Sequence, residues 1–191
     1  MADLIIGNNV LAHVPNINDF VGGIKLILKP NGIATIEVPH LLKLIEHNEF
    51  DTIYHEHFSY FSLNVLKQIF AHHKLLIFDV EEIQTHGGSL RIFIKHKNNK
   101  KFFVSNKIHS LINREKRYGL CKLDTYTKFD KNIRKIKKEL NEFLKKSKIS
   151  SKTVVSYGAP AKGNTLLNYC NIKSRHIPYT VDKNPYKQNL F

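Results

Sequence analysis

The chain contains little cysteine, no tryptophan and no long apolar run. Its two cysteines, Cys121 and Cys170, lack the paired spacing of zinc or redox sites, so we expect both to be reduced. No stretch stays apolar over the roughly 20 residues that a membrane-spanning helix needs. The first residues lead directly into an apolar run rather than into a basic segment and a cleavage site. We therefore predict a cytoplasmic location and no membrane partner.

Acidic residues are scarce beside basic ones, with 16 Asp and Glu against 30 Lys and Arg and a formal net charge of +14. This excess could indicate a basic nucleic-acid-binding domain. However, about two-thirds of the basic residues fall within residues 95–152 at helical spacing, which is typical of a solvated helix face. We therefore predict no nucleic-acid partner, although a basic surface favours an acidic ligand such as a nucleotide diphosphate.

Strand and helix patterns alternate along the first half of the chain. The predicted strands cover residues 2–7, 33–38, 75–80 and 90–96, and the predicted helices cover residues 17–28 and 63–73. A turn is expected at residues 30–32, and Ser62 is expected to cap the second helix. The first strand–helix–strand unit predicts parallel neighbours, and the last strand should run antiparallel to the others. The result is an α/β fold.

The second half of the chain has a different organisation. Residues 105–150 show a basic helical pattern with a weak point near Gly119, which indicates a connector. A new unit follows, with expected strands over residues 153–157 and 179–182, a small-residue turn over 158–164 and a helix over 165–169. The patterns predict a division into residues 1–104, 105–150 and 151–191.

The run Tyr54-His55-Glu56-His57, here called the tetrad, places a phenol, two imidazoles and a carboxylate in four consecutive positions. Such a density of titratable groups, flanked by aromatic residues, favours proton-transfer chemistry. The alternative is a polar loop whose histidines bind backbone groups. A helical zinc motif would need a second histidine where Ser59 stands, so we predict no metal in this chain. In an extended segment the two histidines could still share a metal with a distant third ligand.

Four stretches carry a resemblance to a known family. Residues 4–38 resemble the second half of a class I S-adenosylmethionine-dependent methyltransferase. They follow the order strand, Asn-Asn-Val-Leu-Ala-His, helix, Leu-Lys-Pro-Asn-Gly, strand. Residues 54–62, 85–91 and 157–168 resemble the nucleotide-sugar C-methyltransferases, which add a methyl branch to deoxysugars. The resemblance implies part of a Rossmann-like methyltransferase sheet in residues 1–104, a helical connector, and the start of an α/β domain that binds the nucleotide sugar.

The sequence also departs from this family in two ways. Members normally begin with a four-cysteine zinc module and a strand with a glycine-rich turn that holds the cofactor. Neither feature is found in this sequence. The two glycine pairs cannot form the cofactor turn, because Gly22-Gly23 lies in a helical pattern and Gly87-Gly88 lies between two strands. Members also continue beyond the sequence Asp182 to Gln188 into more of the last domain. We therefore expect a fragment of weak or absent activity, with zinc restricted to the missing module.

The resemblance implies a reaction at a carbon next to a keto group. A base removes the acidified proton, and the enolate attacks the sulfonium methyl of S-adenosylmethionine. The resemblance assigns the role of the base to His57. It implies that Tyr54 donates to the enolate oxygen and that Glu56 orients the histidine or binds the sugar. His55 is then a bystander. An alternative assignment has Tyr54 as the base.

The predicted cofactor-binding residues are Asn9, Val10 and His13. They follow a strand whose carboxyl end should line the cofactor crevice of a doubly wound sheet, so we expect them to face S-adenosylmethionine. Alternatively, His13 only caps the turn before Pro15.

The predicted substrate-binding residues lie in two turns and comprise His86, Gly87, Gly158, Lys162 and Asn164. Glycine lets the backbone approach a ligand closely, and N–H groups at a helix start suit a diphosphate. A plain loop and a simple strand–helix turn are the respective alternatives. The predicted partner is thus a nucleotide-diphosphate sugar, and the alternative function is an O- or N-methyltransferase of the same fold.

Overall fold

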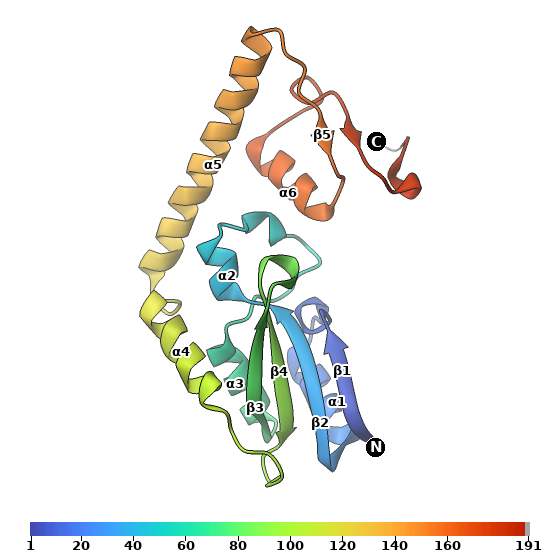
Figure 1. The fold of residues 1–191 in the computed structure, drawn as a ribbon, viewed down its shortest axis with the longest axis vertical. Coiled ribbons are helices and arrows are strands. Elements are labelled where there is room, and N and C mark those ends of the chain that lie inside the picture. Colours follow the sequence, from blue (N-terminus) through green and yellow to red (C-terminus); the bar gives the residue numbers. More distant parts are fainter. Residues whose placement is uncertain (190–191) are drawn as a thin grey trace. The chain divides into compact units, whose positions relative to one another are not determined.

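The computed structural model describes residues 1–189, and these form two compact units (Figure 1). Unit 1 comprises residues 1–47 and 55–126, whereas unit 2 comprises residues 48–54 and the chain from residue 127 onward. The predicted division into residues 1–104, 105–150 and 151–191 stays a prediction, since compactness alone does not define a functional domain. Every helix in the described residues is too short or too polar to traverse a bilayer.

Unit 1 is built on a four-stranded sheet with the order β1-β2-β4-β3. The strands are β1 (Ala2–Asn8), β2 (Leu28–Pro39), β3 (Leu75–Ile83) and β4 (Ser89–His96). β1 and β2 are parallel and are joined by α1 (Ile17–Ile27), whereas β4 is antiparallel to both β2 and β3. The predicted α/β fold, its parallel first pair and its antiparallel last strand are confirmed.

The predicted turn at residues 30–32 is wrong as a strand boundary, because these residues lie within β2. Ala2 pairs with Leu28 and Leu4 pairs with Ile33, so three extra residues of β2 bulge out between the two pairs. Pro30 has no N–H to give to the ladder, and a bulge is a place where a strand accommodates proline. The strand pattern is interrupted at these residues, but β2 resumes its pairing with β1 at Ile33.

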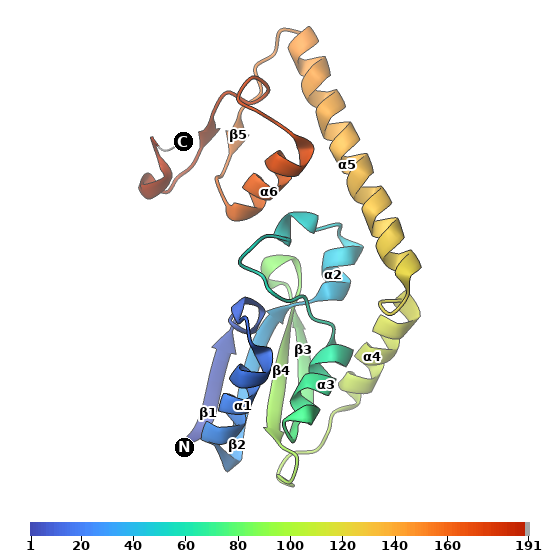
Figure 2. The ribbon, with the colours of Figure 1, turned by 180° about the vertical axis from the view of Figure 1, so that it is seen from behind.

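Helices α1 and α3 (Leu63–His72) cover one face of the sheet, toward the viewer in Figure 2. The covered face consists of alternate residues of the central strands, and those that are fully buried are Ala34, Ile36, Val38, Leu90, Ile92 and Ile94. The alternation follows from the two-residue period of a strand. The prediction that Ser62 caps α3 is confirmed, since its hydroxyl accepts a hydrogen bond from the N–H of Val65 at 3.3 Å.

The basic helical segment is interrupted where the sequence predicted. Helix α4 (Asn106–Tyr118) ends at Gly119, whose φ of +92° is left-handed, and α5 (Leu123–Ile149) follows. The N–H of Gly119 donates to the carbonyl oxygen of Glu115 at 3.1 Å. Glycine reaches this conformation without the steric cost that a Cβ atom would bring, so it ends the helix cleanly.

Unit 2 contains a second parallel strand–helix–strand unit, built from β5 (Ser156–Tyr157), α6 (Ala161–Cys170) and β6 (Thr180–Val181). The predicted order is confirmed, but the strands are shorter than predicted and α6 begins four residues before the predicted residue 165. Lys162 and Asn164 therefore lie in the first turn of α6 rather than in the turn before it. Alanine at the first helical position suits the helix, and Pro160 just before it fixes the approach of the chain.

Candidate active site

The candidate site lies where the parallel strands β1 and β2 end in unit 1, at the upper edge of the sheet in Figure 1. Three chain segments meet at this edge. The N–H of Asn9, just after β1, donates to the carbonyl oxygen of Glu37 on β2 at 2.9 Å. The N–H of His40, just after β2, donates to the carbonyl oxygen of Gly88 in the β3–β4 connection at 3.0 Å. In open α/β sheets, ligands bind at the carboxyl ends of the strands.

The tetrad belongs to the connection between β2 and α3, here called the tetrad loop, which contains the short helix α2 (Leu41–Glu46) and begins and ends at neighbouring points. His40 and Phe61 form an isolated parallel bridge, and the N–H of Leu41 donates to the carbonyl oxygen of Phe61 at 2.9 Å. The boundary between the two units falls inside the tetrad, so that Tyr54 belongs to unit 2 and His55 begins the part in unit 1.

Two hydrogen bonds fasten the tetrad loop to the segment after β1. The Nδ1 atom of His13 lies 2.8 Å from the carbonyl oxygen of Glu56, and the N–H of Phe58 donates to the carbonyl oxygen of Ala12 at 2.8 Å. A carbonyl oxygen only accepts, so Nδ1 of His13 carries the hydrogen and donates it. The predicted cofactor-binding segment therefore positions the backbone of the predicted catalytic segment.

Ring contacts surround the imidazole of His57. Its ring centroid lies 4.8 Å from that of His13, with a tilt of 53° between the planes, and 5.9 Å from that of Tyr60, with an edge-on angle of 88°. Sequence reasoning named His13 and His57 for different tasks, and the fold brings them side by side. Tyr60 was not predicted as a site residue, although its place three residues after His57 in an aromatic run was a signal.

Asn9 has two features that fit a bound ligand. Its backbone is left-handed, with a φ of +54°, and its side-chain Oδ1 is buried without a hydrogen-bond partner in the described structure. A buried acceptor without a donor costs about 1–3 kcal/mol. An ammonium or hydroxyl group of S-adenosylmethionine would supply that donor, so this residue fits the cofactor. Val10, its neighbour, is half-buried beside Gly7.

Glu37 is a buried charge at the end of β2 that sequence reasoning missed. Its side chain is only 6% exposed and accepts hydrogen bonds from the Thr85 hydroxyl at 3.1 Å and the Arg91 guanidinium at 3.2 Å. A single glutamate in the otherwise uncharged strand Ile33 to Val38 was the available signal. The carboxylate ties the β3–β4 connection to the strand that precedes the tetrad loop.

The β3–β4 connection places His86 and Gly87 on the surface at the same edge of the sheet. Three consecutive residues have positive φ angles, with +55° at His86, +86° at Gly87 and +131° at Gly88. A Cβ atom on Gly88 would lie 2.7 Å from the side chain of Lys43, so the turn needs glycine there. Both predicted residues are exposed, as a substrate contact requires.

A buried His–Glu pair holds both ends of the tetrad loop. The Nε2 atom of His40 lies 2.9 Å from a carboxylate oxygen of Glu115 on α4, and both side chains are at most 2% exposed. The same carboxylate accepts from the N–H groups of Leu63 at 2.6 Å and Asn64 at 3.0 Å, at the start of α3. A negative charge there also suits the positive end of the helix. Sequence reasoning missed Glu115 because it lies 75 residues from His40.

In unit 2, the predicted diphosphate turn is closed by hydrogen bonds of its own. Gly158 has a φ of +91° and its N–H donates to the carbonyl oxygen of Val181 at 2.7 Å. The N–H of Ala159 donates to the carboxylate of Asp182 at 2.7 Å. Hydrogen bonds from the N–H groups of Asn184 and Ala159 hold the pKa of Asp182 below its ordinary value. The Ala159 N–H is thus already used by a carboxylate. Two lysines bring positive charge to this region: Lys187, whose Nζ donates to the carbonyl oxygen of Ala159 at 2.8 Å, and Lys162 in the first turn of α6.

Comparison with known proteins yields two family matches and one similar relative. Residues 84–191 match the family described as C-methyltransferase C-terminal domain, and residues 1–75 match a family described as methyltransferase domain. The chain is 34% identical over 193 aligned residues to C-methyltransferase NovU of Streptomyces niveus. That alignment covers 98% of this chain and 44% of the relative, so the chain spans less than half of that protein.

Proposed function

Because the chain belongs to the C-methyltransferase family, we propose that it acts in methyl transfer from S-adenosylmethionine to a carbon atom of a nucleotide-linked deoxysugar. The carbon would lie next to a keto group, since a C–H bond must be acidified before carbon can act as a nucleophile. The observation that carries the proposal is the attachment of the tetrad to the segment after β1 through the hydrogen bond between His13 and Glu56. It joins the predicted base to the predicted cofactor segment.

The tetrad would perform the proton transfer. His57 removes the proton next to the keto group, because a neutral imidazole nitrogen can accept a proton. Tyr54 donates a hydrogen bond to the developing enolate oxygen, and Glu56 orients the histidine or binds a sugar substituent. The rings of His13 and Tyr60 fix the imidazole in place and exclude water from one side.

Residues after β1 would hold the cofactor. S-adenosylmethionine supplies the electrophilic methyl group when it is bound. Asn9 accepts a hydrogen bond from it through Oδ1, Val10 offers apolar contact, and His13 lines the same side while its Nδ1 remains bound to the Glu56 carbonyl.

The substrate would be a nucleotide-diphosphate sugar. His86 and Gly87 approach the sugar from the β3–β4 connection, which is held to the tetrad loop through the His40 N–H and the Gly88 carbonyl. Gly158, Lys162 and Asn164, at the start of α6, bind the diphosphate through the positive end of the helix and the lysine charge.

Proton exchange tests the proposal without cofactor. The purified chain is incubated in deuterated water with a nucleotide-linked 4-keto-6-deoxyhexose, and the NMR signal of the C3 proton is followed. We expect the chain to accelerate loss of this signal. Replacement His57→Asn should lower the exchange rate by about 10²–10⁴-fold, the usual contribution of a general base. Replacement His55→Asn, two positions away in the same loop, is the matched control and should change the rate little.

Three outcomes would contradict parts of the proposal. Exchange no faster than in buffer would contradict a base in this chain. Full exchange by the His57→Asn variant with none by Tyr54→Phe would transfer the task of the base to the phenol. Equal losses in the His55→Asn and His57→Asn variants would indicate that the loop matters only as structure.

A further inference from the structure

A cavity of about 600 Å³ lies in unit 1, at the end of the sheet opposite the candidate active site. Its lining residues come from the end of α1, the start of β2, the turn before β3 and the segment after β4 (Figure 1). We call it the lysine cavity, after its basic lining residues Lys25, Lys74, His96 and Lys97. No acidic residue is among the described residues that line it, so the cavity favours an anion.

Hydrogen bonds hold the lining segments together. The N–H of Lys97, after β4, donates to the carbonyl oxygen of Lys74, before β3, at 3.0 Å. The Nε2 atom of His96 lies 3.0 Å from the carbonyl oxygen of Leu28 and donates its hydrogen, because a carbonyl oxygen only accepts. The segments that carry the basic side chains are therefore fixed to the sheet and to one another.

The lysines of this cavity have no carboxylate partner, unlike a lysine beside it. Lys29 lies between the lining residues Leu28 and Pro30, and its ammonium group forms an ion pair with Asp3 at 2.7 Å. Among the described residues, no carboxylate forms an ion pair with the three lining lysines, which are Lys25, Lys74 and Lys97. Their positive charges are thus not balanced within unit 1.

Asn99, another lining residue, adds a buried donor without an acceptor. It is 5% exposed, and its Oδ1 accepts from the N–H of Lys101 at 2.8 Å. That hydrogen bond fixes the orientation of the amide, so the atom without a partner is the donor Nδ2. The buried ammonium group of Lys95 donates to the carbonyl oxygens of Asn99 and Phe102, at 2.6 and 2.5 Å, and no described carboxylate pairs with it. Buried donors and charges are normally paired, so this loop lacks an anionic acceptor.

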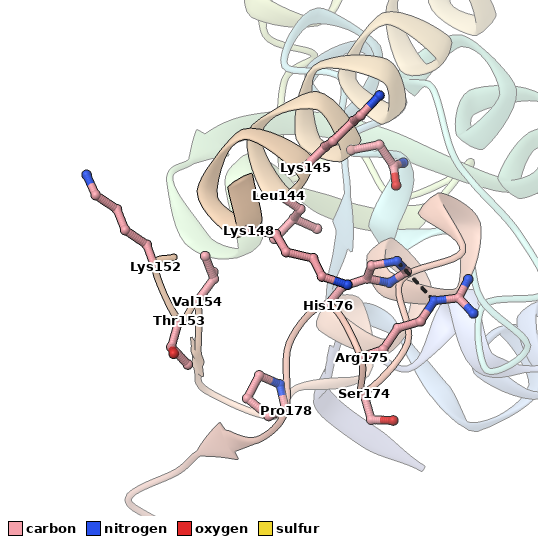
Figure 3. A pocket seen from close by; sticks show the side chains of 11 residues that line it. Leu144, Lys145, Lys148, Lys152, Thr153, Val154, Ser174, Arg175, His176 and Pro178 are labelled. Atoms are coloured by element: carbon pink, nitrogen blue, oxygen red, sulfur yellow. Dashed lines mark hydrogen bonds between the residues drawn. The ribbon is translucent and has the colours of Figure 1, made fainter. Parts of the chain in front are cut away.

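A cavity of about 520 Å³ in unit 2 provides a contrast (Figure 3). It is also lined by basic side chains, but Lys145 and Lys152 extend outward in Figure 3. The Nε–H of Arg175 already donates to Nε2 of His176 at 3.3 Å. In the part of the chain that the structure describes, none of the buried polar atoms without a partner belongs to this lining. Only the lysine cavity therefore combines uncompensated charge with a buried donor that needs an acceptor.

We propose that the lysine cavity binds a small organic anion with two or three carboxylate groups. Its carboxylates accept hydrogen bonds from the lysine ammonium groups and from Nδ2 of Asn99, and its carbon chain contacts Leu28 and Pro30. A single phosphate ion is too small to reach lysines on three segments and the apolar wall together, whereas the cavity volume is typical of a site for a larger molecule. The site does not depend on the proposed methyl transfer.

Calorimetry with the 191-residue chain at low ionic strength tests this site, with citrate, inorganic phosphate and acetate as the probes. We expect one citrate per chain, bound about tenfold or more tightly than phosphate or acetate. Replacements Lys74→Gln and Lys97→Gln should each weaken citrate binding by about three- to tenfold, since each removes a charged donor. Lys100→Gln is the matched control, because this exposed lysine follows Asn99 in the chain but does not line the cavity.

Replacement Asn99→Asp tests the buried donor. Aspartate has nearly the same size and keeps an acceptor for the N–H of Lys101, but it puts a negative oxygen in place of Nδ2. We expect citrate binding to weaken by more than tenfold. Unchanged binding in this variant would contradict the role of the amide.

Other results would overturn the proposal as a whole. Equal weakening by Lys100→Gln and by the two lining-lysine variants would show attraction to net charge rather than a site. Phosphate bound as tightly as citrate would contradict the carboxylate ligand. Loss of citrate binding in Lys148→Gln, with full binding in Lys74→Gln, would place the anion in unit 2. Absence of binding at millimolar citrate would remove the site.

Discussion

The two strand–helix–strand units of the chain have the same parallel connection but differ greatly in what they bury. In unit 1, β1 and β2 have 7 and 12 residues and belong to a four-stranded sheet with a large apolar core. In unit 2, β5 and β6 have two residues each, and one small cluster of buried residues consists of Leu144, Cys170 and Ile172. The connection thus fixes topology, while the number of buried side chains decides how firmly the topology is held.

The polar groups of the two units differ in the same direction. Unit 1 buries Glu37 and the pair His40 and Glu115, and each makes hydrogen bonds to more than one segment. Unit 2 instead carries exposed charges, such as Arg175, on loops and helix ends. The edge of unit 1 that bears the tetrad is therefore fixed by buried charges, and single substitutions should cost more there than in unit 2.

The largest expected effect is that of Glu115→Ala. The substitution leaves His40 and the N–H groups of Leu63 and Asn64 without their acceptor, so we expect a loss of about 3–5 kcal/mol in the free energy of unfolding of unit 1. Urea unfolding followed by hydrogen exchange of α3 amides would measure it. The matched variant in unit 2 is Glu142→Ala, whose carboxylate is 3.9 Å from Lys138 and half-exposed. It should cost about 0.5 kcal/mol or less.

Equal destabilisation by Glu115→Ala and Glu142→Ala would contradict the conclusion that single substitutions cost more at this edge of unit 1 than in unit 2. The exchange data would also locate the effect, since Glu115→Ala should expose α3 and leave α6 unchanged. Rescue of α3 by Glu115→Asp, which keeps the charge on a shorter stem, would show that the carboxylate and not the helix packing is responsible.

These contrasts also explain how much could be predicted from the sequence. Ser62, Gly119 and the apolar strands act within a few residues of themselves, so local patterns predicted them. The tetrad was visible because its members are consecutive. The hydrogen bond from His13 to Glu56 joins residues 43 positions apart, and no local pattern reports such a contact. The orphaned Oδ1 of Asn9 is likewise a property of the folded packing.

A smaller effect is expected from charges on the edge strand β1. Ile5 packs against the core of unit 1, whereas Ile6 is 64% exposed on the opposite face. Replacement Ile5→Lys should destabilise unit 1 by about 2 kcal/mol or more, because it exchanges apolar burial for a charge. Ile6→Lys should leave stability nearly unchanged and reduce self-association, since charged edge strands resist pairing with other chains.

Urea unfolding and size-exclusion chromatography at several protein concentrations would measure both properties. Self-association that is the same in the wild type and in Ile6→Lys would show that β1 does not mediate it. A large loss of stability in Ile6→Lys would contradict the assignment of this side chain to the open face.

The smallest effect is expected at Asp182, in the weakly packed unit 2. The N–H groups of Asn184 and Ala159 donate to its carboxylate at 2.8 and 2.7 Å and hold its pKa below the ordinary value of about 3.9. A folded-state pKa that is lowered means that the ionised group stabilises the fold above that ordinary value, and the contribution is lost as the pH falls through the lower folded value. Replacement Asp182→Asn should therefore reduce the urea midpoint of unit 2 at pH 6, and the difference from the wild type should shrink as the pH falls below the ordinary value. NMR signals of the Ala159 and Asn184 amides would report the transition directly. Equal urea midpoints of the variant and the wild type at pH 6 would show that the carboxylate does not stabilise the turn.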